Sequence, residues 1–179
     1  HLHGVAEIGE GVLLRGTTRI GAGAEVGAYS ILEDAVIAEN ARVKPGCVIE
    51  ASEVGPGAQV GPYARLRPES FVSSGAKIGN FVEVKKSLIR QGAKASHLSY
   101  IGDADIGKNA NLGCGFITCN FDGGPVKHKT VIEENVFVGS DSQIVAPATL
   151  GANSYVASGT TVTGNVPADS LAISRVKME

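Results

Sequence analysis

The sequence predicts an all-β fold, a parallel β-helix with three faces, from a repeat and from the composition. Aliphatic residues return every six positions over most of the 179-residue chain, and glycine commonly follows them. Six residues are too few for a helical hairpin but suit one short strand and a corner, so three repeats complete one triangular coil. The 24 glycines and the aromatic content of only 5% fit tight corners around a narrow core.

The repeat also predicts how the core is filled. An inward aliphatic residue from each repeat stacks on its equivalents in the coils above and below, about 4.8 Å away. A small residue, often Ala, Val or Ser, tends to follow four positions later. The regular aliphatic positions are Ile8, Leu14, Ile20, Val26, Leu32, Ile37, Val43, Ile49, Val54, Val60, Leu66, Val72, Ile78 and Val84.

The breaks in the period indicate three faces. Four steps are one residue short, and all four fall on the same third of the cyclic pattern. The one long interruption, from Thr118 to Ile132, begins on that same face. A random scatter of insertions and deletions would not coincide in this way. The short steps run from Leu32 to Ile37, Ile49 to Val54, Val84 to Ile89 and Ile101 to Ile106.

The length predicts a single domain over residues 1–179. Continuous coils are expected over 8–118 and two more over 132–167. Residues 119–131 should leave the coils as a loop, and residues 168–179 should form a tail. A single loop inserted in a regular solenoid is where function is expected.

Composition excludes several classes of partner. The net charge of −2 gives no electrostatic case for nucleic acid or an anionic membrane. No apolar run is long enough to span a bilayer. Cys47, Cys114 and Cys119 are odd in number and lack zinc-ligand spacing, as do the histidines. We therefore expect a reduced, cytoplasmic protein with no metal, nucleic-acid or membrane partner.

His97 is the one histidine within the repeats, and side-chain alternation turns it outward. A histidine among small polar neighbours can act as a general base, a role worth about 10²–10⁴-fold in rate. The alternative is a surface histidine with a local hydrogen bond. The predicted column has Asn80 below His97, and Cys114, Ser140 and Ser158 above it.

Two cations form the second candidate. Arg67 and Lys85 occupy the same slot one coil apart, which predicts a separation of roughly 5 Å between their Cα atoms. Like charges so stacked are mildly unfavourable unless an anion lies between them, and phosphate is the obvious anion. The alternative is that both side chains splay into solvent.

Several motifs, in this order, resemble one family. That family is the bifunctional bacterial N-acetylglucosamine-1-phosphate uridyltransferase/glucosamine-1-phosphate N-acetyltransferase, and the resemblance is to its C-terminal acetyltransferase domain. The motifs are Gly61-Pro-Tyr-Ala-Arg-Leu-Arg67-Pro, Gly79-Asn-Phe-Val-Glu-Val-Lys85-Lys86, Ser96-His97-Leu-Ser-Tyr100-Ile-Gly-Asp103, Ile117-Thr-Cys-Asn120-Phe-Asp-Gly123, Val136-Phe-Val-Gly-Ser140-Asp and Leu171-Ala-Ile-Ser-Arg175.

The resemblance implies a left-handed β-helix that forms a homotrimer with active sites between neighbouring chains. It implies acetyl transfer from acetyl-CoA to the 2-amino group of glucosamine 1-phosphate, for UDP-N-acetylglucosamine and cell-envelope synthesis. By motif position, His97 is the general base, Arg67 and Lys85 hold the sugar phosphate, and Tyr100 and Asn111 contact the sugar. The acetyl-CoA positions are Cys114, Asn120, Phe121, Ser140, Ser158 and Arg175.

The chain also departs from the family. Phe121 stands where the family often has Tyr, and Cys114 where it has Ala. No Gly-rich nucleotidyltransferase motif is present, so the N-terminal uridyltransferase domain and its magnesium are not expected. We expect Asn120 to orient either the substrate or the tautomer of His97. The alternatives are an acyltransferase for another amino sugar or sugar nucleotide, and a trimeric scaffold without catalysis.

Overall fold

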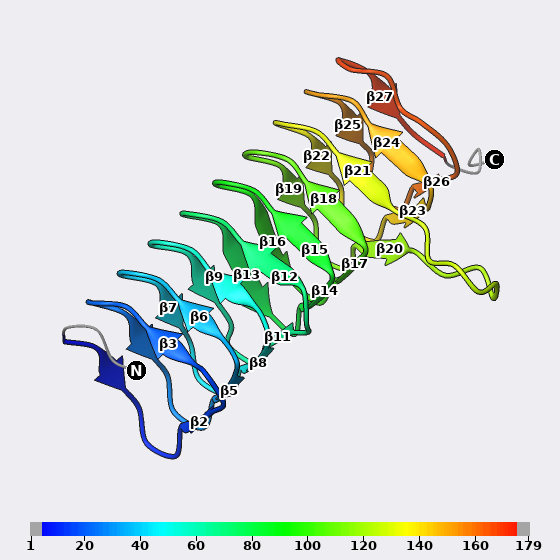
Figure 1. Cartoon of the computed structure of the whole chain (residues 1–179). Helices are drawn as coiled ribbons and strands as arrows, with labels where there is room; N and C mark the ends of the chain where they lie inside the picture. The colour runs from blue at the N-terminus through cyan, green and yellow to red at the C-terminus, as the bar shows by residue number, and fades with distance from the viewer. Residues whose placement is uncertain (1–4, 175–179) are drawn as a thin grey trace.

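A computed structural model describes residues 5–174 and shows a left-handed parallel β-helix (Figure 1). Successive coils stack along one axis, and each contributes a strand to each of three parallel sheets of ten, nine and eight strands. This architecture confirms the predicted fold class. Within the described residues, no helix is long and apolar enough to span a membrane.

The three sheets form the three faces of the coil. The first sheet contains β1 (Glu7–Ile8), β4 (Glu25–Val26), β7 (Arg42–Val43), β10 (Gln59–Val60), β13 (Lys77–Asn80), β16 (Lys94–His97), β19 (Asn111–Leu112), β22 (Phe137–Val138), β25 (Tyr155–Val156) and β27 (Leu171–Ala172). The second contains β2 (Leu13–Arg15), β5 (Ile31–Glu33), β8 (Val48–Glu50), β11 (Arg65–Leu66), β14 (Glu83–Lys85), β17 (Tyr100–Gly102), β20 (Ile117–Cys119), β23 (Gln143–Val145) and β26 (Thr161–Val162). The third contains β3 (Arg19–Ile20), β6 (Val36–Ile37), β9 (Glu53–Val54), β12 (Ser70–Val72), β15 (Ser87–Ile89), β18 (Ala104–Ile106), β21 (Thr130–Ile132) and β24 (Ala148–Leu150).

All four short steps lie at the corner where the chain passes from the second sheet to the third, as the period predicted. Residues at this corner adopt positive φ, including Asp34 (50°), Ala51 (40°) and Asp103 (51°). Only a few residue types enter this region without strain, with Gly, Asn and Asp favoured. The corner is therefore a backbone constraint that recurs coil after coil.

The predicted aliphatic columns form the core. Leu66 and Ile78 are fully buried, and the repeat positions from Ile20 to Val84 are nearly so. Ile8 and Leu14 differ, with 39% and 44% of their surface exposed. They belong to the first described coil, which is covered from one side only, so an inward side chain there still meets solvent.

Phe116 is the largest fully buried side chain and occupies a slot that elsewhere holds small residues. Its carbonyl accepts a hydrogen bond from the Tyr100 amide, and the equivalent slots in the coils below and above hold Ser99 and Ser142. The small side chains of Ser99 and Ser142 thus leave room for the Phe116 ring between them. The low aromatic content correctly indicated a narrow core, but it did not predict this exception.

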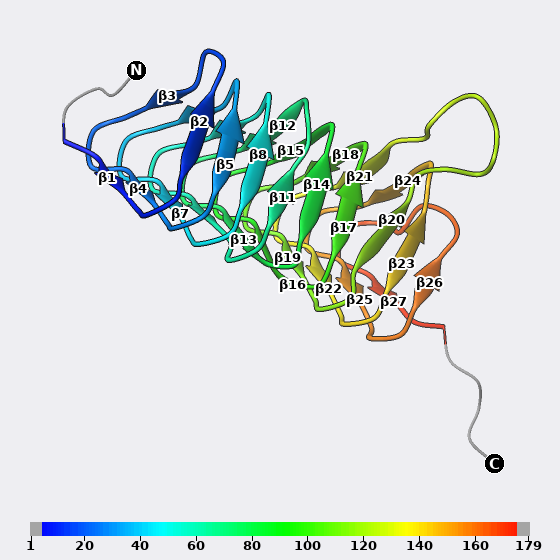
Figure 2. The ribbon, with the colours of Figure 1, turned by 90° about the horizontal axis from the view of Figure 1, so that it is seen from below.

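The inserted loop leaves the coils between β20 and β21 and extends well beyond them (Figures 1 and 2). It is closed on itself: the His128 amide donates to the Asn120 carbonyl at 2.9 Å, and His128 Nε2 lies 3.0 Å from Asp122 Oδ2. The Gly124 amide and His128 both hydrogen-bond to Asp122 and lower the pKa of its carboxyl group. The loop is an ordered arm that starts at the short-step corner.

The segment after residue 167 continues the first sheet for one more strand. Leu171–Ala172 (β27) pairs in parallel with β25, in register with Tyr155 and Val156. The expected tail of residues 168–179 therefore contains a further strand of the first sheet.

We predict that Leu66→Ala costs about 2–5 kcal/mol of the free energy of unfolding, because it opens a cavity in a closed core. Leu14→Ala, on the same sheet but 44% exposed, should cost less than about 1 kcal/mol. Urea denaturation followed by circular dichroism measures both. If Leu14→Ala lowered the free energy of unfolding as much as Leu66→Ala, the first described coil would be as well buried as the central coils and the prediction would be wrong.

Candidate functional site

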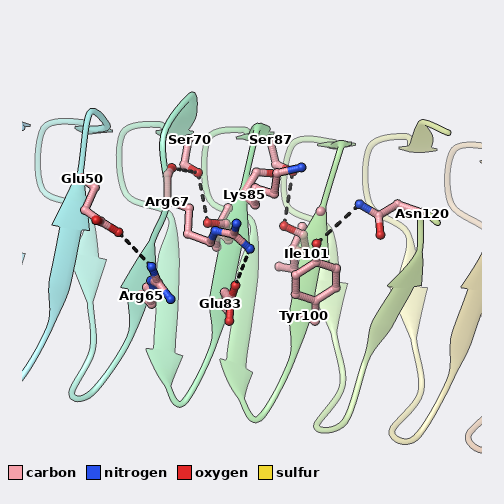
Figure 3. A network of polar contacts seen from close by, with 12 residues as sticks. Glu50, Arg65, Arg67, Ser70, Glu83, Lys85, Ser87, Tyr100, Ile101 and Asn120 are labelled. Carbon is pink, nitrogen blue, oxygen red and sulfur yellow. Dashed lines mark hydrogen bonds and ion pairs between the residues drawn. The ribbon is translucent and has the colours of Figure 1, made fainter. Parts of the chain in front are cut away.

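Three of the four predicted substrate residues, Arg67, Lys85 and Tyr100, lie on the outer face of the second sheet, along β11, β14 and β17 (Figure 3). Parallel pairing places Arg65 beside Glu83 and Glu83 beside Tyr100. The same register brings Lys85 beside Gly102. Polar side chains from successive coils therefore form two adjacent columns along this face.

Arg67 and Lys85 are stacked one coil apart, as predicted: the Arg67 amide donates to the carbonyl of Val84 at 2.8 Å. Each of the two cations already has an anionic partner within the chain, a carboxylate. Arg67 Nη1 lies 3.0 Å from Glu83 Oε1, and Lys85 Nζ lies 3.5 Å from Asp103 Oδ2. Nor do they splay freely, since only 37% of the Arg67 side chain and 25% of the Lys85 side chain are exposed.

Lys85 belongs to a network that extends to the start of the loop. The amide Nδ2 of buried Asn120 donates to Asp103 Oδ2 and, at 3.4 Å, to the Tyr100 hydroxyl. Figure 3 shows Asn120 directed at Tyr100, with Lys85 on the neighbouring strand. One cation, one carboxylate, one amide and one phenol therefore share the end of β17.

Gly102 makes this arrangement possible. A Cβ atom at Gly102 would collide with the Tyr100 hydroxyl and the Asn120 amide. Gly102 and Asp103 lie at the end of the motif that begins at Ser96, but neither was predicted to be a site residue. The register of the repeat could have identified Gly102. Lys85 occupies the same position one coil earlier and has a long side chain, whereas Gly102 has none and leaves space above it.

His97 is the last residue of β16 in the first sheet. It therefore lies at the corner between the first and second sheets, at the opposite edge of the second sheet from Lys85. Its exposed ring places Nδ1 2.7 Å from Asn80 Oδ1. Glycine at position 79 permits this approach of the two coils, since a Cβ there would collide with the Ser96 carbonyl. The carbonyl oxygen of Asn80 only accepts hydrogen bonds, so in the neutral ring Nδ1 carries the proton and Nε2 keeps a free lone pair.

The local hydrogen bond and the general-base role of His97 are therefore compatible. The partner that orients the ring is Asn80. Within the described chain Asn120 does not contact His97, because its amide binds Tyr100 and Asp103 instead.

The column above His97 is built as predicted. The Asp141 amide donates to the Cys114 carbonyl at 2.7 Å, and the Gly159 amide donates to the Ser140 carbonyl at 2.8 Å. Cys114, Ser140 and Ser158 are all exposed. The column above His97 therefore consists of small, exposed side chains.

Other predicted residues lie apart from these groups. Asn111 is on the first sheet, in register with Lys94 and Phe137. Phe121 is exposed on the loop, where Lys127 Nζ stacks 4.1 Å from its ring centroid. Arg175 lies outside the described residues. No cluster of three or more His, Cys, Asp or Glu side chains suited to a metal ion occurs between residues 5 and 174.

The described chain does not bring the base and the cations together. His97 stands before β17, while Arg67 and Lys85 line the far edge of the same sheet. A three-residue strand spans roughly 10 Å, so the two groups flank a face rather than converge on a point.

The sequence is similar to those of known proteins. Residues 129–164 match the family model described as bacterial transferase hexapeptide (six repeats). The chain is 56% identical over 174 residues to a bifunctional protein GlmU of Sorangium cellulosum, covering 97% of this chain and 37% of that protein. This chain is related to the bifunctional GlmU proteins.

A second GlmU protein, from Trichlorobacter lovleyi, is 54% identical over 92% of this chain and 36% of its own length. The chain thus spans little more than a third of the GlmU relatives that it matches. Among solved structures, LpxA of Bacteroides fragilis, a UDP-N-acetylglucosamine acyltransferase, aligns with a TM-score of 0.51 at 14% identity. That alignment covers 97% of this chain and 69% of that one. This last likeness concerns the fold alone.

We predict that neutral His97 is the Nδ1–H tautomer, because Asn80 Oδ1 accepts a hydrogen bond from Nδ1–H. Nitrogen-15 NMR of histidine-labelled protein distinguishes a protonated Nδ1 from an unprotonated one. The Asn80→Ala variant should lose the preference, while His128 in the loop serves as an internal reference. A dominant Nε2–H form in the unaltered protein would contradict the assignment.

Proposed function

We propose that this chain transfers the acetyl group of acetyl-CoA to the 2-amino group of glucosamine 1-phosphate, giving N-acetylglucosamine 1-phosphate. The observation that carries the proposal is that a cation pair and a histidine with an unprotonated ring nitrogen lie on one face of a chain related to the GlmU proteins. Arg67 and Lys85 can hold a phosphate at one edge of the second sheet, and His97 offers a free imidazole nitrogen at the other.

The chemical step follows from the tautomer of His97. The sugar amine attacks the thioester carbonyl while Nε2 takes a proton from the attacking nitrogen. The N–C bond forms, the C–S bond breaks, and the departing CoA thiolate receives from Nε2 the proton that the amine gave up, so that His97 is neutral again. Asn80 stabilises the imidazolium because its carbonyl still accepts the Nδ1 proton.

The cation pair supplies position rather than chemistry. Glu83 and Asp103 form ion pairs with Arg67 and Lys85, and both cations are partly buried. A phosphate that replaces part of these contacts gains charge-assisted hydrogen bonds, since guanidinium and ammonium groups both suit it. Fixing the phosphate limits the orientations of the sugar amine.

We further propose that the working unit is a homotrimer. Base and cations lie at different corners of one chain, so a neighbouring copy can supply the missing part of each site. The column of Cys114, Ser140 and Ser158 would take the pantetheine arm, together with Asn120, Phe121 and Arg175. A cytoplasmic location, and small molecules as the only ligands, complete this proposal.

His97→Ala should lower kcat for glucosamine 1-phosphate by about 10²–10⁴-fold, because no other group takes the amine proton. The assay follows release of the CoA thiol. His128→Ala, which removes a histidine from the loop, is the control and should retain activity close to the unaltered protein.

The His97→Ala variant should still be stabilised by acetyl-CoA in a thermal-shift measurement, because binding to the folded state raises the melting temperature. A variant that keeps near-full turnover would refute His97 as the base. If acetyl-CoA fails to shift the melting temperature of the unaltered protein, the chain is a scaffold instead.

Arg67→Ala and Lys85→Ala should each lower kcat/KM for glucosamine 1-phosphate by roughly 10–100-fold, mainly through KM, because each removes a charged hydrogen-bond donor. Arg65→Ala is the matched control: it removes an arginine of the same sheet that pairs with Glu50 at 3.2 Å. An equal loss in the control would mean that general surface charge, and not the pair, is responsible.

A further inference from the structure

We propose that Asp103 is a positioning residue that sets the direction of the hydrogen bonds through Asn120 to Tyr100. In this arrangement the Tyr100 hydroxyl can donate a hydrogen bond to the amino sugar, and the side-chain carbonyl oxygen of Asn120 can accept one from it. The inference deepens the proposed function and rests on it for the identity of the substrate.

Asp103 lies at the centre of the network. Its side chain is only 12% exposed, and one oxygen, Oδ2, faces both the Asn120 amide and, at 3.5 Å, the Lys85 ammonium. Asn120 is itself buried and holds the Tyr100 hydroxyl at 3.4 Å with the same Nδ2 atom. The amide therefore uses both of its N–H groups on these two partners.

The direction of the bonds follows from what each group can do. An ionised carboxylate only accepts hydrogen bonds, so Asn120 must turn its NH₂ group towards Asp103. The same NH₂ group then faces Tyr100, whose oxygen accepts. Because the phenol oxygen is the acceptor, its own proton remains free for a substrate oxygen. A carboxylate at one end of the chain of bonds thus decides the donor at the other end.

The backbone does not explain why an aspartate stands here. Asp34, Ala51 and Asp103 occupy the same corner in different coils, with φ of 50°, 40° and 51°. Ala51 shows that this corner forms without a carboxylate. Asp34 uses its carboxylate locally, for the amide and hydroxyl of Thr17, and these bonds lower its pKa. Asp103 alone among these three reaches the residues of the candidate site.

Gly102 gives the network its space. With any larger residue at that position, the Tyr100 hydroxyl and the Asn120 amide would be displaced. Asn120 also lies at the start of the loop, and the Thr130 amide at the loop's far end donates to the Asp103 carbonyl at 3.2 Å. The backbone and the side chain of Asp103 thus hold the two ends of the loop.

The test compares Asp103→Asn with Asp103→Ala and uses Asp34→Asn as the control. Asparagine has the shape of aspartate and tolerates the same φ, but its NH₂ group can donate to Asn120 and turn that amide over. We therefore expect both Asp103 variants to lower kcat/KM for glucosamine 1-phosphate by about 10-fold or more. Asp34→Asn should stay within about twofold of the unaltered protein.

The proposal is overturned if Asp103→Asn retains kcat/KM within about threefold, since shape alone would then suffice. The proposal is also overturned if kcat/KM rises in Asp103→Asn. Asp103 would then act only as an anion that competes with the substrate phosphate for Lys85. A matching loss in Asp34→Asn would mean that the corner, and not this residue, matters.

A second readout needs no turnover. In protein labelled with nitrogen-15 asparagine, the side-chain NH₂ signals of Asn120 should shift in Asp103→Asn and stay unchanged in Asp34→Asn. Asn120→Ala assigns these signals. If the unaltered chain fails to acetylate glucosamine 1-phosphate but the signals shift as expected, the proposed substrate fails while the positioning role stands. Unshifted signals in Asp103→Asn would refute the positioning role.

Discussion

The register of parallel hydrogen bonds between coils is the constraint on which the rest of the structure depends. Each strand pairs with the strand one full coil away, so residues of equal phase stand about 4.8 Å apart in straight columns. A column of aliphatic residues becomes core, and a column of outward residues becomes a line of neighbouring functional groups. Arg67 lies over Lys85, and Asn80 beside His97, for this one reason.

The corner between the second and third sheets has a separate role. The short steps fall there, the positive φ angles recur there, and the loop leaves the coils there. A corner that already tolerates changes in length can accept an insertion without disturbing the columns on either side. The loop therefore begins beside the cation pair, and Asn120 and Asp103 tie it to that edge of the sheet.

Ion pairs between neighbouring coils hold the cations on the outer face of the second sheet. Isolated surface ion pairs contribute little to stability, typically 0–1 kcal/mol. The pairs Arg67–Glu83 and Lys85–Asp103 are more useful as a means of holding cations in place, because each carboxylate restricts a long and flexible side chain. The same carboxylates keep the stacked cations from repelling one another before a ligand binds.

The sequence by itself determined the coils, the three faces, the position of the loop and the columns through His97 and through Arg67 and Lys85. It could do so because a fixed period converts position in the chain directly into position in space. Only the tertiary structure decided the partners of these residues: Asn80 for His97, Glu83 and Asp103 for the cations, and Asn120 for Tyr100. Partners depend on side-chain rotamers and on gaps such as that at Gly102, and a period carries no information about either.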